Sequence, residues 1–410
     1  MDLIQELNAR GFIYQSSDEE GASKVLAEGQ QLAYIGFDCT ADSLHVGSLV
    51  VIMLLRRWQK AGHRPIILLG GATTMVGDPS GKDQSRQLLT TDQIQSNKES
   101  LKKVFQSYLD FDCPKTGALM VDNLDWWKDI SYLELLRNVG TLMTVNRMMT
   151  FETVQRRLER EQPLTFLEFN YMILQGYDFD HLEKTLGCRF QFGGSDQWGN
   201  MIAGLELSRK MGLDQCYVLT TPLLTTASGQ KMGKTEQGAV WLNADKLSDY
   251  DFWQFWRNCD DRDVEKFLKL FTDLTLDEVA KIMECTDQDS LNKAKIILAN
   301  EQTKLCRGLK AQQECDARAQ AIFSTDASLR DQYLPELSMN GADHISLVDF
   351  LALNDLAESK GAARKLIRQQ GIKINNQTVF DEMMILTVAE IQTQGITLSV
   401  GKKKHFKIIM

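Results

Sequence analysis

Short apolar runs alternate with longer amphipathic stretches through the first half of the chain, and this alternation restricts its fold more than any other feature. The stretch over 46–60 has helical spacing and carries Arg56, Arg57 and Lys60 late, where basic side chains complement the helix dipole. Strands that alternate with helices predict an α/β fold with a Rossmann-like, doubly wound parallel sheet. The expected strands cover 32–37, 64–69, 118–121, 188–192 and 216–224.

The second half has a different pattern, so we expect more than one domain. The chain has 410 residues, which exceeds one ordinary hydrophobic core. From about 246 to 323 it reads as amphipathic helices, and a Ser-, Asp- and Gly-containing stretch follows. The remainder is short and mixed, with helices near 347–353 and 360–370 and strands near 372–374 and 396–400. We expect an α/β domain over 1–235, an α-helical domain over 236–323, a linker over 324–344 and a small α+β domain over 345–410.

Composition and charge exclude several classes of protein. Hydrophobic residues make up 43% and charged residues 25%, as in globular proteins, and no apolar run approaches the roughly 18 residues of a membrane span. The start of the chain lacks the apolar core of a signal peptide. The eight cysteines are scattered without a CxxC pair, which argues against zinc and disulfides and favours the cytoplasm.

The net charge of −9 argues against nonspecific nucleic-acid binding, but it is unevenly distributed. Residues 345–410 contain nine Lys and Arg against six Asp and Glu, a net charge of +3 that leaves −12 for the rest. Lysines at 402–404 and 407 lie at the end of the sequence. This region is either a solvated basic tail or a small module that contacts phosphate.

His45-Val46-Gly47-Ser48 follows the first strand, at the expected start of a helix. Ligands of doubly wound sheets bind beyond the carboxyl ends of the strands, where a helix start offers free N–H groups to a phosphate. Gly47 would let a nucleotide approach closely, and His45 could donate to a phosphate oxygen. A structural histidine that caps the turn is the alternative.

Lys231-Met232-Gly233-Lys234-Thr235 places two cations three residues apart in a Gly-containing loop. Such a loop could close over a triphosphate and stabilise charge on a leaving pyrophosphate, an effect that is largest in the transition state. A solvated surface loop is the alternative. A P-loop is excluded because the GxxxxGK[ST] spacing does not occur.

Tyr171, Gln175 and Asp178 fall at i, i+4 and i+7 of a helical run and should project from one face. Tyr34 lies in the first expected strand, and Asp78 follows the second. Together with these two residues, the three side chains of the helix could bind both ends of an amino acid. An ammonium group needs acceptors, and a distal hydroxyl needs a donor and an acceptor. An exposed polar helix face would show the same spacing.

The histidine and lysine motifs, in this order, resemble the HIGH and KMSKS motifs of class I aminoacyl-tRNA synthetases, and the rest of the chain resembles the bacterial-type tyrosyl-tRNA synthetases. The sequence departs from the family pattern at Ser48, where a second histidine is usual. The C-terminal segment resembles an S4-type RNA-binding module. The segments that carry the resemblance are 34–38, 77–82, 145–148, 171–178 and 193–200.

The resemblance assigns a role to each residue of the expected site. Tyr34 and Asp178 would bind the phenol of L-tyrosine, and three side chains, Asp78, Tyr171 and Gln175, would hold its ammonium group. Gln197 would lie near the substrate carboxylate. The residues around ATP would be Asp38, Thr40, His45, Gly47, Ser48, Lys82, Arg86, Asp196, Lys231 and Lys234. The residues that contact tRNA would be Asn146 and Arg147 near its acceptor end, and Arg364, Lys365 and Arg368 at its phosphates.

The implied reaction is the ATP-dependent activation of tyrosine, followed by transfer of the tyrosyl group to tRNA(Tyr). ATP is a substrate, Mg²⁺ would accompany its phosphates, and no protein-held metal is expected. By the resemblance, the protein would be a homodimer in the cytoplasm without membrane contact, and its middle helices would recognise the anticodon side of the tRNA. Two alternatives stay open: a tryptophanyl enzyme, which Tyr34 and Asp178 disfavour, and a non-catalytic RNA-binding protein with a degenerate synthetase body.

Overall fold

The computed structural model describes residues 1–80, 89–227, 229, 232–235, 238–322, 334–401 and 404–409, with the main chain alone at 234, 235, 322, 394 and 404. It divides into two compact units, Met1–Gln312 and Gln313–Met410. Within these ranges no helix has the length and apolar character needed to cross a membrane.

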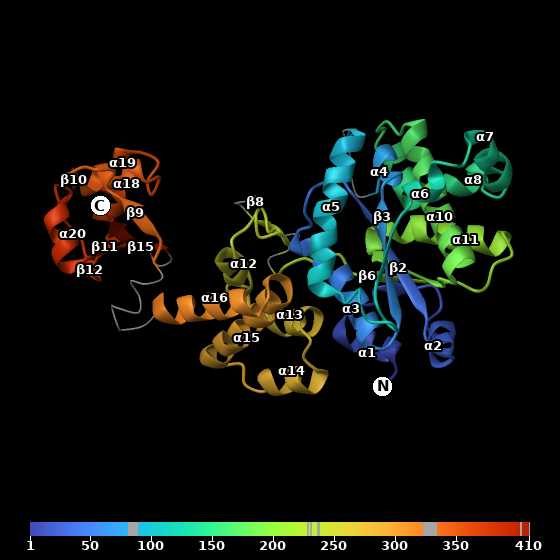
Figure 1. Cartoon of the computed structure of the whole chain (residues 1–410), viewed down its shortest axis with the longest axis horizontal. Helices are drawn as coiled ribbons and strands as arrows, with labels where there is room; N and C mark the ends of the chain where they lie inside the picture. The colour runs from blue at the N-terminus through green and yellow to red at the C-terminus, as the bar shows by residue number, and fades with distance from the viewer. Residues whose placement is uncertain are drawn as a thin grey trace. The chain divides into compact units, whose positions relative to one another are not determined.

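The first unit is built on a mixed, mainly parallel sheet (Figure 1). Its strand order is β1-β6-β5-β2-β3-β4; β2 to β6 are parallel, and β1 is antiparallel to β6. The five expected strands are confirmed with small differences at their ends, and the sequence did not indicate the two-residue β1. The bounds are β1 Gln15–Ser16, β2 Leu32–Asp38, β3 Arg64–Gly70, β4 Leu119–Asp122, β5 Phe190–Gly194 and β6 Tyr217–Thr221.

The order of the strands places helices on both faces of this sheet. The chain moves from β2 through α3 (Leu49–Lys60) to β3 and through α5 (Thr91–Tyr108) to β4, in one direction across the sheet. It moves from β5 through α11 (Trp198–Lys210) to β6 in the opposite direction. Because parallel crossovers are right-handed, α3 and α5 cover one face and α11 covers the other, together with α10 (Phe166–Leu186), as Figure 1 shows. The direction reverses between β2 and β5, which is where such sheets bind ligands.

The helix α10 is defined at both ends and lies unusually close to α11. Thr165 and Glu168 form a capping box at its start, and Gly187 ends it in the left-handed conformation. At the crossing, a Cβ atom on Gly176 would lie 3.3 Å from the Cα of Gly204. The two main chains therefore touch, which sets the distance between α10 and α11.

The other elements of this unit are short or belong to the helical region. The stretch expected to be one helix over 46–60 is a 3₁₀ turn, Val46–Ser48, followed by α3. The helical region packs around Trp256, Phe267 and Phe271. Its helices are α12 Asp249–Arg257, α13 Val264–Phe271, α14 Leu276–Ile282, α15 Gln288–Arg307 and α16 Leu309–Ile322, the last of which crosses the boundary between the units. The remaining elements are α1 Leu3–Arg10, α2 Glu19–Ala27, α4 Thr73–Val76, α6 Leu124–Trp127, α7 Tyr132–Leu135, α8 Val145–Met148, α9 Glu152–Glu159, β7 Lys234–Thr235 and β8 Gly238–Ala239.

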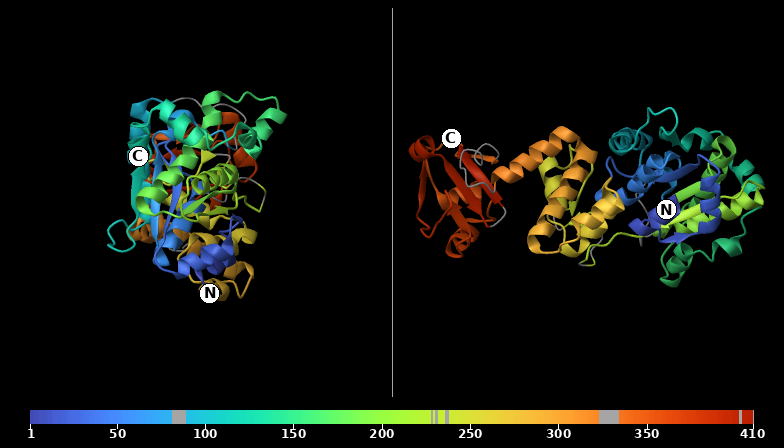
Figure 2. Two further views of the ribbon diagram at one scale, coloured as in Figure 1. Left: turned by 90° about the vertical axis from the view of Figure 1, so that its right-hand side faces the viewer. Right: turned by 90° about the horizontal axis from the view of Figure 1, so that it is seen from below.

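The second unit has a five-stranded sheet of order β12-β11-β14-β15-β9 and a two-stranded sheet β10-β13 (Figure 2). Its buried core includes Leu347, Phe350, Ile367 and Leu398. This small α+β unit confirms the expected fold class. Its elements are β9 Glu336–Ser338, β10 His344–Ser346, α18 Leu347–Leu353, α19 Lys360–Arg368, β11 Ile372–Ile374, β12 Gln377–Thr378, β13 Ile385–Thr387, α20 Val388–Gln394, β14 Ile396–Val400 and β15 Lys404–Ile409.

The described part of the lysine-rich end, Lys404–Ile409, forms the strand β15, so the alternative of a solvated tail is excluded for this segment. The strand β15 pairs with β14 on one side and with β9 on the other. Phe406 lies opposite Leu398, and Ile408 is buried. The sequence analysis missed this strand because of its lysines, although the apolar residues among them have the pattern of a half-buried strand. The strand β9 lies within the stretch 324–344, which therefore contributes to this sheet.

Candidate functional site

A cavity of about 570 Å³ opens where the winding of the first unit's sheet reverses. Its walls come from the ends of β2 and β5, from α10 and from the turn that begins at His45. The sequence had placed most of its candidate residues here, and the structure brings them together. The predicted residues that line the cavity are Tyr34, Asp38, Thr40, His45, Gly47, Ser48, Asp78, Tyr171, Gln175, Asp178, Asp196 and Gln197.

Asp178 is a fully buried carboxylate at one end of the cavity, held by three N–H donors. Its Oδ1 accepts hydrogen bonds from the Nε1 atoms of Trp126 at 2.9 Å and Trp127 at 2.8 Å. Its Oδ2 accepts from Nδ2 of Asn123 at 2.9 Å. Burial raises the pKa of Asp178 from 3.8 to about 7, and the three hydrogen bonds oppose this rise by stabilising the ionised form. The carboxylate is therefore fixed in orientation before a ligand arrives.

Tyr34 lies close enough to Asp178 for the charge of that carboxylate to affect the ionisation of its phenol. Burial and the charge of Asp178 raise the pKa of Tyr34 well above 10, so the phenol is neutral at pH 7. Its ring packs against Phe179 with the centroids 5.4 Å apart. Its buried hydroxyl has no hydrogen-bond partner within the described part of the chain. A neutral hydroxyl beside a fixed carboxylate can bind a group that both donates and accepts.

Gln191 is a lining residue that the sequence analysis missed. It lies opposite Tyr34 in the pairing of β5 with β2, so the two side chains share a face of the sheet. Its side chain is buried, and its Oε1 has no partner among the residues that the structure describes. A polar residue in the middle of an otherwise apolar strand was the available signal.

The predicted face of α10 is confirmed, because Tyr171, Gln175 and Asp178 all line the cavity. The hydroxyl of Tyr171 donates to Oδ2 of Asp38 at 3.1 Å, and Thr73 donates to the other oxygen of that carboxylate at 2.8 Å. Asp38 thus fixes the direction of the Tyr171 hydroxyl. The buried Oε1 of Gln175 has no partner in the described residues, which makes it an available acceptor.

Asp78 supplies a second buried carboxylate to the cavity. Nε2 of Gln197 donates to its Oδ2 at 2.8 Å, and the main-chain N–H of Ser80 donates to its Oδ1 at 2.9 Å. Asn200 completes the group by donating to the hydroxyl of Ser80 at 3.2 Å. This cluster joins the segment after β3 to the segment after β5. An ammonium group would be attracted to the buried carboxylate of Asp78.

His45 begins the 3₁₀ turn, and its Nδ1 accepts from the main-chain N–H of Gly47 at 2.9 Å. The ring proton of the neutral imidazole is therefore on Nε2. A Cβ atom on Gly47 would lie 2.6 Å from the His45 ring and 2.9 Å from the carbonyl oxygen of Met232. Gly47 is thus required where the histidine motif meets the lysine motif.

The main chain holds these two motifs together. The N–H of Val46 donates to the carbonyl of Val240 at 2.9 Å, and that of Leu242 donates to Leu44 at 2.8 Å. The N–H of Val240 in turn donates to Gly233 at 3.0 Å. The chain that follows the lysine motif is therefore fastened to the histidine turn.

Some predicted ATP-site residues cannot be placed. Lys82, Arg86 and Lys231 lie outside the described residues. The main chain of Lys234 lies in β7, and its side chain is not described. Their roles stay predictions.

The predicted tRNA-contacting residues are exposed and lie outside the cavity lining. Asn146 and Arg147 belong to α8, where the Arg147 guanidinium pairs with Glu206 at 2.5 Å. On α19, Arg368 pairs with Glu382 at 2.5 Å. Arg364 and Lys365 are on the same helix, one turn earlier.

Two models of known protein families together match most of the chain. A family model described as class I tRNA synthetases (W and Y) matches residues 27–324, and one described as a tyrosine–tRNA ligase SYY-like C-terminal domain matches 328–408. A tyrosine–tRNA ligase of Pelagibacter ubique is 49% identical over 99% of this chain and 98% of its own length. One of Brucella abortus (strain 2308) is 50% identical over the same shares of the two chains.

A solved structure shares the fold of the first unit. A C-terminally truncated mitochondrial tyrosyl-tRNA synthetase of Aspergillus nidulans aligns with a TM-score of 0.72 and 31% identity, covering 78% of this chain and 94% of its own. The matches cover both the cavity-bearing unit and the C-terminal unit. The chain therefore belongs to the tyrosine–tRNA ligases, within the class I tRNA synthetases.

Proposed function

We propose that tyrosine binds in the cavity with its phenol between Tyr34 and Asp178. The observation that carries this proposal is a neutral, buried hydroxyl without a partner in the described chain, beside a carboxylate oriented by three N–H donors. The substrate hydroxyl would donate to Asp178 and accept from Tyr34. Phenylalanine would leave both groups unpaired in a buried site, so discrimination should be strong, a property for which tyrosine-specific synthetases are the standard example.

The ammonium group of the substrate would bind at Asp78. The oxygens of Tyr171 and Gln175 face the same cavity and can accept its remaining protons. Asp38 supports this role by accepting the hydrogen bond that the Tyr171 hydroxyl donates. Gln197, which donates to Asp78, would lie near the substrate carboxylate and help to align it.

ATP would bind against the turn at His45, with the Nε2 proton of His45 directed to a phosphate oxygen. Gly47 would let the nucleotide approach closely, Ser48 would lie beside it, Thr40 would lie at the phosphates and Asp196 would meet the ribose. The lysines and Arg86 would surround the phosphates from segments whose side chains are not described. Asp38 lines the same cavity and accepts hydrogen bonds from the hydroxyl groups of Tyr171 and Thr73.

The carboxylate oxygen of tyrosine would attack the α-phosphorus of ATP, forming tyrosyl-adenylate as the bond to pyrophosphate breaks. The 3′-terminal ribose hydroxyl of tRNA(Tyr) would then take the tyrosyl group and release AMP. A carboxylate is already nucleophilic, so the first step needs no general base. Alignment of the two substrates and stabilisation of charge on the leaving pyrophosphate supply the catalysis.

Mg²⁺ would enter with ATP and neutralise part of its phosphate charge. The described residues contain no group of three or more His, Cys, Asp or Glu side chains that could hold a metal ion. The phosphates themselves would therefore be its main ligands.

We place the enzyme in the cytoplasm, because translation there uses the tRNA that it charges.

The exposed basic residues would contact tRNA. Asn146 and Arg147 would lie near the acceptor end, and Arg364, Lys365 and Arg368 would meet phosphates through the second unit. Phosphate contacts position an RNA without reading its sequence. Arg368 is already paired with Glu382, so we expect it to contribute less than its two neighbours.

We further propose that the protein is a homodimer through the surface of α7 to α9 and the start of α10. These helices share one buried cluster with α10 and α11, yet they expose large apolar side chains. Leu133 is 78% exposed, Phe166 69% and Val145 61%. Such a patch marks an interaction surface. Sedimentation should show that Leu133→Glu with Phe166→Glu yields monomers, whereas Tyr14→Glu, at a similarly exposed residue elsewhere, leaves a dimer; a double variant that stays dimeric would exclude this surface.

The decisive experiment is ATP–pyrophosphate exchange with each of the twenty amino acids, without tRNA. Exchange with tyrosine alone would support the assignment of the cavity. Exchange with tryptophan would keep the fold and overturn the roles of Tyr34 and Asp178, and none in a folded sample with Mg²⁺ would favour the RNA-binding alternative. Asp178→Asn should reduce exchange with tyrosine, while Asp125→Asn, a substitution at an exposed carboxylate nearby, should not.

A further inference from the structure

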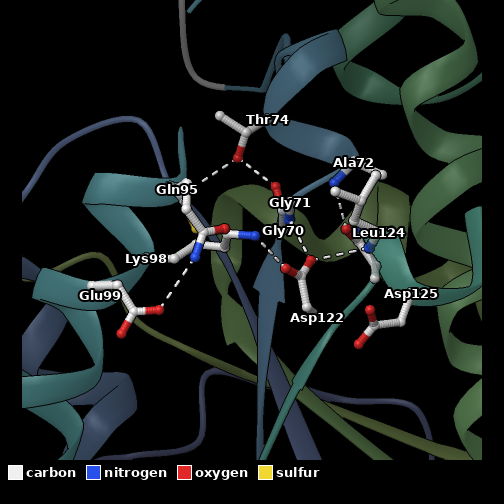
Figure 3. A network of polar contacts seen from close by, with 12 residues as sticks. Gly70, Gly71, Ala72, Thr74, Gln95, Lys98, Glu99, Asp122, Leu124 and Asp125 are labelled. Carbon is white, nitrogen blue, oxygen red and sulfur yellow. Dashed lines mark hydrogen bonds and ion pairs between the residues drawn. The ribbon is translucent and has the colours of Figure 1, made fainter. Parts of the chain in front are cut away.

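A buried ion pair joins Lys98 of α5 to Asp122 at the end of β4 (Figure 3). The Nζ of Lys98 lies 2.5 Å from Oδ2 of Asp122, and the two side chains are 9% and 19% exposed. Lys98 falls in the buried stripe of α5, between Ile94 and Leu101. A lysine in such a stripe is costly unless it is paired, so its presence calls for a specific explanation.

Asp122 uses its other oxygen to fasten two segments of main chain. Its Oδ1 accepts from the N–H of Gly71 at 3.1 Å and from the N–H of Leu124 at 3.0 Å, as Figure 3 shows. A Cβ atom on Gly71 would lie 2.2 Å from this oxygen, so the approach depends on glycine. One carboxylate thus joins the end of β3, the turn after β4 and, through Lys98, the helix α5.

The turn that Asp122 fixes carries every donor that the structure gives to Asp178. Asn123 is the next residue, and α6 supplies Trp126 and Trp127. Asn123 also accepts from the N–H of Ala72 at 2.7 Å, which ties the same turn to the segment after β3. The position of this turn therefore sets the orientation of Asp178.

We propose that Lys98 is a positioning residue for recognition of the substrate hydroxyl, acting through Asp122 on the segment that orients Asp178. This inference rests on the proposed role of Asp178. The ion pair with Lys98 holds the Asp122 carboxylate in place, so that its Oδ1 remains aligned with both main-chain donors. Without that charge the turn is released, and Asp178 loses its fixed orientation although no residue that touches the substrate has changed.

The test compares Lys98→Met with wild type in ATP–pyrophosphate exchange, measuring kcat/KM for tyrosine and for phenylalanine. We expect kcat/KM for tyrosine to fall at least tenfold, while that for phenylalanine and the KM for ATP change less than threefold, because phenylalanine gains nothing from Asp178. Equal losses for both amino acids would show a merely structural role and overturn the proposal. Unchanged kcat/KM values for both would also overturn it.

Matched variants separate this proposal from the one on which it rests. Lys102→Met, one turn further along α5 at a lysine paired with exposed Glu99, should leave the ratio unchanged. Lys98→Arg, which keeps the charge, should restore most of it. If Lys98→Met does not fold, Asp122→Asn, which keeps an Oδ1 acceptor, should show the same selective loss. If Asp178→Asn leaves the tyrosine-to-phenylalanine ratio unchanged, the assignment of the phenol site fails; if it lowers the ratio and the Lys98 and Asp122 variants do not, only the positioning role fails.

Discussion

The main chain of His45 pairs with that of Trp241 in an isolated antiparallel bridge. This bridge joins the turn at the proposed phosphate site to the segment that follows the lysine motif, although the two are far apart in the sequence. Gly47 and Gly233 lie at the contact, and neither has room for a side chain. The lysine segment is therefore held beside the histidine turn by backbone geometry before ATP binds.

Gly47→Ala should impair catalysis without altering the tyrosine pocket. The added methyl group would meet the His45 ring and the carbonyl of Met232, so the two segments must move apart. Displacing catalytic groups by about 1 Å can cost about 10²-fold in rate, and we expect a loss of that size in kcat for pyrophosphate exchange. Gly361→Ala, whose nearest contact would be at 3.7 Å in the second unit, is the control and should exchange at the wild-type rate.

Lys234→Ala should lower kcat for activation far more than it weakens tyrosine binding. The lysine would stabilise charge that develops on the leaving pyrophosphate, and removal of such a group costs about 10²-fold or more in kcat. Equilibrium dialysis with tyrosine should give a nearly unchanged Kd. An unchanged kcat, with the same tyrosine Kd, would refute this role.

Tyr34→Phe should weaken activity while leaving the free protein at least as stable as wild type. The hydroxyl is buried and has no partner among the described residues, so its removal relieves an unsatisfied polar group in the unliganded state. The bound state would lose one hydrogen bond to tyrosine, about tenfold in kcat/KM. Thermal unfolding and exchange kinetics on one preparation would check both halves, and a marked loss of stability would contradict the first.

The stability of the protein should depend on the ionisation of Asp178. Burial raises the pKa of its carboxyl from 3.8 to about 7, so the folded state holds the proton more tightly than the unfolded state. The resulting stabilisation is complete below pH 3.8 and is lost as the pH rises through about 7. The free energy of unfolding of wild type, relative to Asp178→Asn, should therefore decrease between about pH 5 and pH 8. Denaturant titrations across this window would measure it, and a constant difference would show that the pKa is not raised.

Replacing both Arg364 and Lys365 by alanine should weaken tRNA binding and reduce its salt dependence. If each contacts one phosphate, each removes about one unit from the slope of log K against log salt. Exchange without tRNA should be unaffected, since these residues belong to the second unit. Lys24→Ala, in the first unit, provides a surface control. Unchanged affinity and slope in the double variant would contradict a role for α19.

The sequence predicted the elements whose pattern is local. The five main strands of the first sheet are buried apolar runs, and the face of α10 follows from helical spacing alone. The strand β15 was not recognised because its partners, β9 and β14, are needed to make sense of a run that begins with lysines. Strand pairing of this kind depends on segments that periodicity does not connect.

The site was predictable where a side chain faces the cavity and less so behind it. Tyr34 and Asp178 follow from the family pattern, and both line the cavity. Asn123, Trp126 and Trp127 were missed because they act on Asp178 and come from a distant segment with no motif of its own. Hydrogen bonds between segments brought together by folding leave no spacing in the sequence.

The contact of Gly176 with Gly204 limits how the pocket could be adapted to a bulkier amino acid. Moving α10 toward α11 to widen the pocket is blocked, because their main chains already touch. A larger substituent on the substrate would need space that is made by shortening the side chains around the substrate ring. Attempts to broaden the substrate range should therefore begin with the lining residues and leave the helix crossing intact.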